Sequence, residues 1–416
     1  MSRLSNSIFF HTIISEKECL SETLSSIYFM KGFLRDICLK EKYYNFKDIL
    51  SSDYVSKPSF EFYNEKLFYY LIENKGFNEG YSRLRNTKKN VAVFNLFWSK
   101  NYGAILTAYA LQTILLKMGY NPYLIKYTNK KLVEKNTDPF WKFEQENLFS
   151  SKNIINFNDL SLLNKYYDNF IVGSDQIWRY KYTKHLYKTY FLSFVDKNKK
   201  KIAYAASFGK NYWEGRKKVT KKIRKNIRTF DGISVREKSG IKICKNTFKV
   251  KCKAVFDPVF IMKKNDWKAL LKKSTINLNS FCLIYILDET FKLNSQINII
   301  IKSLNITGYW LNIGNTNVYD FLKSFQSSQR VITDSYHGLC FSIIFKKDFI
   351  CLNNKGRGEE RFISLLSDLN LMDRLYDDFS EVKWENLPPI DYKKIENIIE
   401  EKRKEGIDFL LSNLEK

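Results

Sequence analysis

The sequence predicts an α/β protein with two doubly wound domains, each a mainly parallel sheet covered by helices. Three observations support this fold class. The chain has 416 residues, more than one ordinary domain uses. From Val91 onward, apolar runs of strand length alternate with runs of helical length. The strand runs are apolar on both faces, which is typical of a parallel sheet with helices on both sides.

The first set of alternating elements begins with the apolar run VAVFNLF, which predicts a strand. The corner WSKNYG follows, then a helix in AILTAYALQTILLKMG that stops at Gly119, and a second strand in NPYLIKY. The pattern continues through NFIVGSDQIW, KIAYAASFG, the basic helix WEGRKKVTKKIRKNIRTF, the strand DGISVRE, the short helix KSGIKICKN and KAVFDPVFI. Asp257-Pro258 interrupts the last of these runs.

The second set repeats the alternation. Its predicted helices are NDWKALLKK, ETFKLNSQINIIIKSL, NVYDFLKSFQSSQ, LCFSIIF and RFISLLSDLNL, and its predicted strands are FCLIYIL, GYWLNIG, RVITDS and DFICLNN. We therefore divide the chain into residues 88–235 and 236–390 as the two domains, with 391–416 as a long amphipathic C-terminal helix carrying i,i+4 charge pairs. Residues 1–87 form an N-terminal extension of unknown role, with mostly helical patterns.

Composition narrows the function classes. The formal net charge of +25 favours anionic partners, although the abundance of Lys, Asn and Ile is also what an AT-rich coding sequence produces. The seven cysteines show no CxxC spacing and predict buried thiols in a reducing compartment. The sequence has neither a complete signal peptide nor a membrane-spanning run. We expect a cytoplasmic protein, or one that is peripheral at the inner face of the cell membrane.

Each predicted strand ends in a polar corner, where doubly wound folds bind their ligands. In SKNYG, Asn101 and Gly103 either expose backbone N–H groups to an anion or simply form a turn. In GSDQ, Asp175 and Gln176 either orient sugar hydroxyls or, with Ser174, cap a helix.

Further corners follow along the chain. Ser207 and Gly209 close the AYAA strand, where either a ligand approaches or an ordinary glycine turn forms. Arg236 ends another strand and either binds a carboxylate or phosphate or pairs internally with Glu237. Arg361 begins a helix and is a weaker candidate for contact with the same ligand.

The corner DSYHG holds His337, one of only three histidines, together with Ser335 and Gly338. A lone histidine is more often structural. This one, however, lies where a strand meets a helix N-terminus, which favours binding of an anion. Ligands are also expected in the cleft between two such domains, and this corner would face that cleft. We therefore predict that His337 acts in the reaction.

Missing motifs exclude several chemistries. GxxxxGK[ST] and GxGxxG are absent, which disfavours nucleotide hydrolysis and hydride transfer. HExxH, DxD and Cys–His clusters are also absent, so we expect no metal. The basic segment 216–228 either contacts anionic lipid or is a solvated face. Nucleic-acid binding is not expected, because no recognised module accompanies the charge.

The ordered set of motifs resembles the polysaccharide pyruvyl transferase family. The matching stretches cover roughly residues 91–372 and include NYGAILTAYALQTILLKMGY, NFIVGSDQIW, YFLSFVDKNKKKIAYAASFG, ISVREKSG, FDPVFI, VITDSYHGLCFSIIF and RFISLLSDLNL. Tyr336 stands where the family often has phenylalanine, and residues 1–87 fall outside the resemblance.

The resemblance implies two Rossmann-like domains in a GT-B-like arrangement, with residues 88–235 on the acceptor side and 236–390 on the donor side. It also implies transfer of the enolpyruvyl group of phosphoenolpyruvate onto sugar hydroxyls of a cell-surface glycan or its lipid-linked precursor. The product would be a pyruvate ketal, phosphate would be released, and no cofactor would be needed.

Within that chemistry we expect His337 to be the acid or the phosphate-contacting group, since histidine titrates near neutral pH. Arg236 would hold the anionic groups of the donor, with Arg361 as a second candidate, and Asp175 would orient or deprotonate the acceptor hydroxyl. Asn101, Gly103 and Ser335 would line the donor pocket. Two alternatives stay open: a GT-B glycosyltransferase that uses a nucleotide sugar, and a non-catalytic scaffold of glycan assembly with residues 1–87 as its docking segment.

Overall fold

The computed structural model describes residues 89–128, 138–151, 153–154, 156–278 and 280–415. The predicted N-terminal extension, 1–87, lies outside the described residues, as do Cys19 and Cys38. Of the five cysteines within them, all are free, and every one except the partly buried Cys252 is buried.

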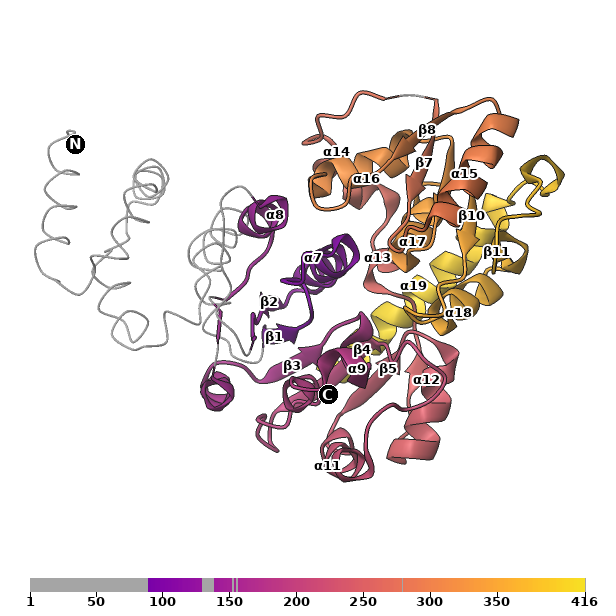
Figure 1. The fold of residues 1–416 in the computed structure, drawn as a ribbon. Helices are drawn as coiled ribbons and strands as arrows, with labels where there is room; N and C mark the ends of the chain where they lie inside the picture. The colour runs from indigo at the N-terminus through magenta and orange to yellow at the C-terminus, as the bar shows by residue number, and fades with distance from the viewer. Residues whose placement is uncertain (1–88, 129–137, 152, 155, 279, 416) are drawn as a thin grey trace, which may run out of the picture. The chain divides into compact units, whose positions relative to one another are not determined.

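The first sheet has six parallel strands in the order β2-β1-β3-β4-β5-β6. Its strands are β1 (Asn90–Phe94), β2 (Asn121–Leu124), β3 (Asn169–Val172), β4 (Lys200–Ala206), β5 (Gly232–Val235) and β6 (Lys253–Ala254). It forms the indigo-to-rose part of Figure 1. Because β6 pairs with β5, this sheet extends beyond residue 235, where we placed the domain boundary.

Within the described part of the chain, eight α-helices accompany the strands of the first sheet. They are α7 (Tyr102–Lys117), α8 (Pro139–Asn147), α9 (Tyr180–Thr183), α10 (Tyr187–Tyr190), α11 (Lys217–Ile227), α12 (Lys238–Ile243), α13 (Pro258–Ile261) and α14 (Lys268–Leu271). The most deeply buried long one is α7, with Ala104, Leu106 and Leu111 at 0% exposure. Such an all-round apolar helix belongs inside a protein.

The second sheet has five parallel strands in the order β11-β10-β9-β7-β8. Its strands are β7 (Phe281–Tyr285), β8 (Thr307–Trp310), β9 (Arg330–Thr333), β10 (Asp348–Leu352) and β11 (Leu375–Tyr376). Its helices are α15 (Phe291–Ser303), α16 (Val318–Ser327), α17 (Tyr336–Ile344) and α18 (Glu360–Asp368). Two parallel sheets with intervening helices confirm the predicted α/β fold class.

One apolar core contains residues from both sheets and from the helices between them. Tyr102 of α7 stacks on Phe321 of α16, with ring centroids 4.3 Å apart and planes 6° apart. Trp267 meets Phe341 of α17 edge to face at 5.3 Å. Buried aromatic pairs of this kind stabilise a fold beyond the area they bury. The Tyr102–Phe321 pair also holds α7 against α16, a helix of the second sheet.

The C-terminal helix α19 (Tyr392–Leu414) connects the two halves instead of standing apart. At its start, Tyr392 donates a hydrogen bond to the carbonyl of Lys347, next to β10. Farther along, Arg403 Nε donates to the carbonyl of Ile261 in α13 at 2.9 Å. The yellow helix of Figure 1 follows this path. Ion pairs along it have i,i+3 spacing, such as Lys402 with Glu405, instead of the predicted i,i+4 spacing.

Candidate active site

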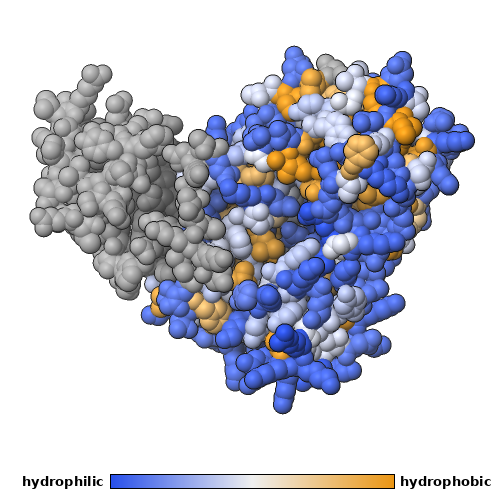
Figure 2. Space-filling view, in the orientation of Figure 1, coloured by the Kyte–Doolittle hydropathy of each residue, from blue (hydrophilic) through white to orange (hydrophobic). Residues whose placement is uncertain are grey.

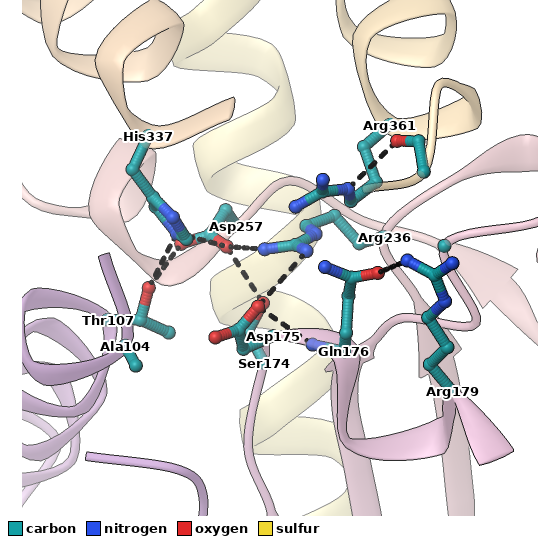
Figure 3. A network of polar contacts seen from close by, with 12 residues as sticks. Ala104, Thr107, Ser174, Asp175, Gln176, Arg179, Arg236, Asp257, His337 and Arg361 are labelled. Carbon is teal, nitrogen blue, oxygen red and sulfur yellow. Dashed lines mark hydrogen bonds and ion pairs between the residues drawn. The ribbon is translucent and has the colours of Figure 1, made fainter. Parts of the chain in front are cut away.

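The corners after four strands bring polar side chains together, and Asp257 lies at their centre (Figure 3). This carboxylate follows β6, is fully buried and starts α13, where Pro258 occupies the first turn. Its Oδ2 accepts a hydrogen bond from Ser174 Oγ at 2.8 Å and one from Arg236 Nη1 at 2.7 Å. Its Oδ1 accepts one from Thr107 Oγ1 at 3.1 Å. Asp257 therefore joins side chains from three other segments.

The ionised form of Asp257 is the stable one. Burial alone would raise the pKa of this carboxyl group, because a charge is costly in an apolar interior. The neighbouring imidazole of His337 and the positive charge of Arg236 outweigh burial and hold the pKa of Asp257 well below its ordinary value. Asp257 is thus a fixed negative charge at the centre of the cluster.

His337 is the second residue of α17, in the first turn of the helix that follows β9. We expected it in the corner before the helix, but the helix already begins at Tyr336. The imidazole Nε2 lies 3.1 Å from Thr107 Oγ1 of α7 and 3.6 Å from Asp257 Oδ2. His337 thus contacts residues that belong to the first half of the chain, and it is only 6% exposed.

Gly103 allows this approach of α7 to α17. A Cβ at Gly103 would lie 1.8 Å from Nδ1 of His337, far inside van der Waals contact. The glycine is therefore required by the close packing of the imidazole. Its neighbour Asn101 caps α7, because its side chain accepts a hydrogen bond from the backbone N–H of Ala104 at 3.1 Å.

Arg236 follows β5 and is buried, with 5% of its surface exposed. Besides its bond to Asp257, its Nη2 lies 3.6 Å from Asp175 Oδ1, and its guanidinium stacks 4.3 Å from the ring centroid of Tyr336. Among the described residues, Nε and Nη2 find no hydrogen-bond partner. Buried donors of this kind are normally satisfied, so a ligand is a natural acceptor for them.

Arg361 lies on the same tyrosine. Its guanidinium is 5.3 Å from the ring centroid of Tyr336, and its Nε donates to the carbonyl of Gly358 at 3.1 Å. Burial and the like charge of Arg236 lower the pKa of Arg361 to about 10. Figure 3 shows the two guanidinium groups as neighbours. Two buried cations so close together favour an anion between or beside them.

Asp175 has a strained backbone. Its φ of 85° and ψ of 178° lie in a region that is nearly restricted to glycine. Its side chain accepts a hydrogen bond from the N–H of Gln176 at 2.8 Å and faces Arg236. Strain in a non-glycine residue persists where the surrounding structure imposes it and is frequent at functional sites. Asp175 therefore caps the short helix that follows it and at the same time faces Arg236.

Gln176 and Gly209 are in close contact with each other. Gln176 Oε1 accepts a bond from Arg179 Nη1 at 3.0 Å, and a Cβ at Gly209 would lie 2.3 Å from that oxygen. Gly209 has a φ of 68° and donates its N–H to Glu237 Oε1 at 2.9 Å. The adjacent Ser207 is fully buried, and its Oγ has no hydrogen-bond partner among the described residues.

Ser335 and Gly338 have roles within α17. Ser335 is the N-cap, and its Oγ accepts a hydrogen bond from the N–H of Gly338 at 3.3 Å. A Cβ at Gly338 would lie 2.3 Å from Thr333 Oγ1, so the glycine allows α17 to pack on β9. The structure therefore brings together His337, Asp175, Arg236, Ser174 and Gly103, and gives Asn101, Ser335 and Gly338 local duties.

Sequence reasoning did not select Asp257 or Thr107 as site residues. Asp257 precedes a proline, so we interpreted it only as a break in the strand pattern. Thr107 is a single polar residue in an apolar helix. The recurrence of aspartate at strand ends was the available signal for Asp257, whereas the sequence held no signal for Thr107.

The sequence model of the polysaccharide pyruvyl transferase family matches residues 101–356, a segment that contains Asn101, Asp175, Arg236, Asp257 and His337. The chain belongs to the polysaccharide pyruvyl transferase family. The match confirms the resemblance that the motifs indicated. No curated protein matches the chain closely enough to count as a relative.

Solved structures similar to this family member include two epimerases. The UDP-N-acetylglucosamine 2-epimerase of Rickettsia bellii is 10% identical, with a TM-score of 0.44 over 78% of this chain and 96% of that one. The UDP-GlcNAc 2-epimerase of Neisseria meningitidis, bound to UDP-GlcNAc, is 12% identical, with a TM-score of 0.44 over 78% of this chain and 100% of that one. Likenesses this distant carry nothing about substrate or reaction.

Proposed function

We propose that this protein transfers the enolpyruvyl group of phosphoenolpyruvate onto two hydroxyls of a glycan or its lipid-linked precursor, forming a pyruvate ketal and releasing phosphate. The observation that carries the proposal is a pair of buried guanidinium groups. Those of Arg236 and Arg361 both contact the ring of Tyr336. That ring in turn lies beside the imidazole of His337. Phosphoenolpyruvate carries a carboxylate and a phosphate, the two groups that arginine recognises in a bidentate manner.

The reaction requires an acid, a group that orients the acceptor hydroxyl, and stabilisation of the leaving phosphate. His337 would protonate the methylene carbon, which makes the neighbouring carbon electrophilic. Asp175 would orient the attacking hydroxyl and accept its proton. Arg236 and Arg361 would hold the anionic groups of the donor, with the unpartnered Nη2 of Arg236 as one of the donors.

The experiment is donor turnover by the full chain. Phosphoenolpyruvate is incubated with cell-surface glycan, and we expect release of inorganic phosphate together with a mass gain equal to pyruvic acid less one water. His337→Ala should abolish both while the protein stays folded. Nucleotide release from a nucleotide sugar would instead identify a glycosyltransferase, and ligand-independent capture of glycan enzymes without turnover would identify a scaffold.

We further propose that α11 contacts an anionic membrane that carries the acceptor. Only Ile223 and Ile227 of this helix are buried, and it contains no acidic residue. The segment 216–228, which includes α11, has eight basic residues. Arg224 donates two hydrogen bonds to the carbonyl of Thr247, and the other seven are exposed. Hydrophilic side chains project at the lower edge of Figure 2, where α11 lies in Figure 1.

Vesicle sedimentation tests this contact. The full chain should bind vesicles rich in anionic phospholipid and not neutral ones, and each basic residue near the surface contributes about 1 kcal/mol. Replacing Lys218, Lys221 and Lys225 by glutamine should weaken binding at least tenfold. Equal binding of the variant, or equal binding to neutral vesicles, would refute the contact. Among the described residues, none of the helices combines the length and apolar character needed to cross a bilayer.

A further inference from the structure

The hydrogen bonds around Asp257 fix the direction of every proton near it. Its two oxygens accept four bonds: Oδ2 from Ser174 Oγ and Arg236 Nη1, and Oδ1 from Thr107 Oγ1 and the N–H of Val259 at 3.2 Å. A carboxylate has about four acceptor positions, so this one is fully occupied and has no place for a proton of its own.

Thr107 has a single hydroxyl hydrogen. Its oxygen lies 3.1 Å both from Asp257 Oδ1 and from His337 Nε2. If the hydrogen pointed at Nε2, the oxygens of Thr107 and Asp257 would face each other in a buried site with only lone pairs between them. The hydrogen therefore belongs on the Asp257 side, and the hydroxyl oxygen accepts from the imidazole.

The surroundings of Nε2 lead to the same conclusion. Its two polar neighbours, Thr107 Oγ1 and Asp257 Oδ2 at 3.6 Å, are both acceptors. A lone pair on Nε2 would face them both, whereas an N–H satisfies them. The other ring nitrogen, Nδ1, lies beside Gly103 and has no hydrogen-bond partner among the described residues.

We infer that Thr107 and Asp257 hold His337 as the Nε2–H tautomer, so that Nδ1 is the atom that exchanges a proton with the substrate. The inference rests on the proposed function only for the identity of that substrate. Thr107 and Asp257 are positioning residues, and Nδ1 of His337 is the reacting atom.

The proton balance of the proposed reaction then follows. The imidazolium gives its Nδ1 proton to the methylene carbon of phosphoenolpyruvate, where the double-bond electrons form the new C–H bond. The ring becomes neutral and keeps its Nε2 proton. As the two acceptor hydroxyls form C–O bonds and the C–O bond to phosphate breaks, Asp175 accepts the proton of the first hydroxyl and passes it to the departing phosphate. The proton of the second hydroxyl restores Nδ1–H. Asp257 stays ionised throughout and stabilises the imidazolium.

The decisive measurement is the tautomer of His337 in the full chain. With only three histidines, His11, His185 and His337, imidazole-¹⁵N labelling gives three ring systems in a long-range ¹H–¹⁵N spectrum. Glutamine substitutions of His11 and His185 assign them. At a pH where the ring is neutral, we expect Nε2 at the shift of a protonated nitrogen and Nδ1 at that of an unprotonated one. The opposite assignment, or a mixture of tautomers, would overturn the inference.

Thr107→Val and Thr107→Ser form a matched pair for the positioning role. Valine keeps the shape and removes the hydroxyl, so we expect mixed tautomers and a fall in kcat of about tenfold, comparable to one lost hydrogen bond, with KM for phosphoenolpyruvate unchanged. Serine keeps the hydroxyl and should restore both the tautomer and kcat. Equal behaviour of the two variants would refute the role of the hydroxyl.

The two readouts separate this inference from the proposed function. The tautomer is measured without substrate, so it stands or falls on the ring alone. If wild-type protein shows Nε2–H but does not release phosphate from phosphoenolpyruvate, the reaction is wrong and the tautomer is right. If phosphate is released and the spectrum shows Nδ1–H, the reaction is right and the assignment of the reacting atom is wrong.

Discussion

The contact between Gly103 and His337 leads to the sharpest prediction, because one added methyl group would overlap the imidazole at Nδ1. In Gly103→Ala, the new Cβ would lie 1.8 Å from Nδ1. Ordinary contact begins near 3.4 Å, so the ring must retreat by about 1.6 Å. The ring is bonded at 3.1 Å to Thr107, and a retreat of that size breaks the bond.

The magnitude has two opposing parts. Breaking the bond leaves buried polar groups unpaired, which costs about 1–3 kcal/mol. Alanine in place of glycine favours a helix by up to about 1 kcal/mol, and Gly103 lies within α7. We therefore expect a net loss of about 0–3 kcal/mol in the free energy of unfolding. Turnover should fall by about a hundredfold, since a displacement of roughly 1 Å at a reacting group has that effect.

The assay is a double-mutant cycle with His337→Ala, combining urea unfolding with phosphate release. Without the imidazole, the clash disappears, so Gly103→Ala should become neutral or stabilising in that background. Gly356→Ala serves as the control, because its Cβ would meet nothing closer than 3.5 Å. Equal destabilisation by Gly103→Ala in both backgrounds, or full turnover by the single variant, would refute the packing argument.

Three further predictions concern charges and strain. Asp175→Ala should be roughly 1 kcal/mol less stable than Asp175→Gly by urea unfolding, because glycine alone readily adopts a φ of 85° with a ψ of 178°. Equal stabilities of the two variants would show that the backbone strain is absent. Arg361→Ala should raise KM for phosphoenolpyruvate about tenfold or more in initial-rate measurements, because a charged hydrogen bond is lost, whereas the exposed Arg357→Ala should not. The pKa of Asp257 is depressed in the folded state, so its stabilisation is complete above its unfolded pKa of 3.8 and is lost as the pH falls below it. The difference in unfolding free energy between wild type and Asp257→Asn should therefore shrink below about pH 4, and a difference that is constant down to pH 2.5 would contradict the depressed pKa.

Local patterns were sufficient to predict the order and type of the elements. Strands such as β1 and β9 are short apolar runs followed by polar corners, and these features depend only on neighbouring residues. The start of α17 was misplaced because Ser335 and Tyr336 look like loop residues, although a serine before a helix is also an ordinary N-cap. Where a cap and a loop use the same residue types, packing decides, and the sequence alone does not show it.

The site itself was only half predictable, for a reason that lies in its construction. His337, Arg236 and Asp175 are conspicuous because each is a charged or titratable side chain at the end of an apolar strand. Asp257 is equally placed, but its neighbour Pro258 drew attention to backbone geometry. Its partners Ser174 and Thr107 lie 83 and 150 residues away, so no window of sequence contains the network.

A buried carboxylate with four donors also constrains how such a site can function. Removing any one donor leaves the charge less compensated, so the cluster resists piecemeal change and behaves as one unit. Within the imidazole, Nε2 faces Thr107 and Asp257, whereas Nδ1 has no hydrogen-bond partner among the described residues. The fixed charge therefore lies behind the ring, and the reactive nitrogen in front of it. In that arrangement Asp257 determines which nitrogen reacts without ever receiving a proton.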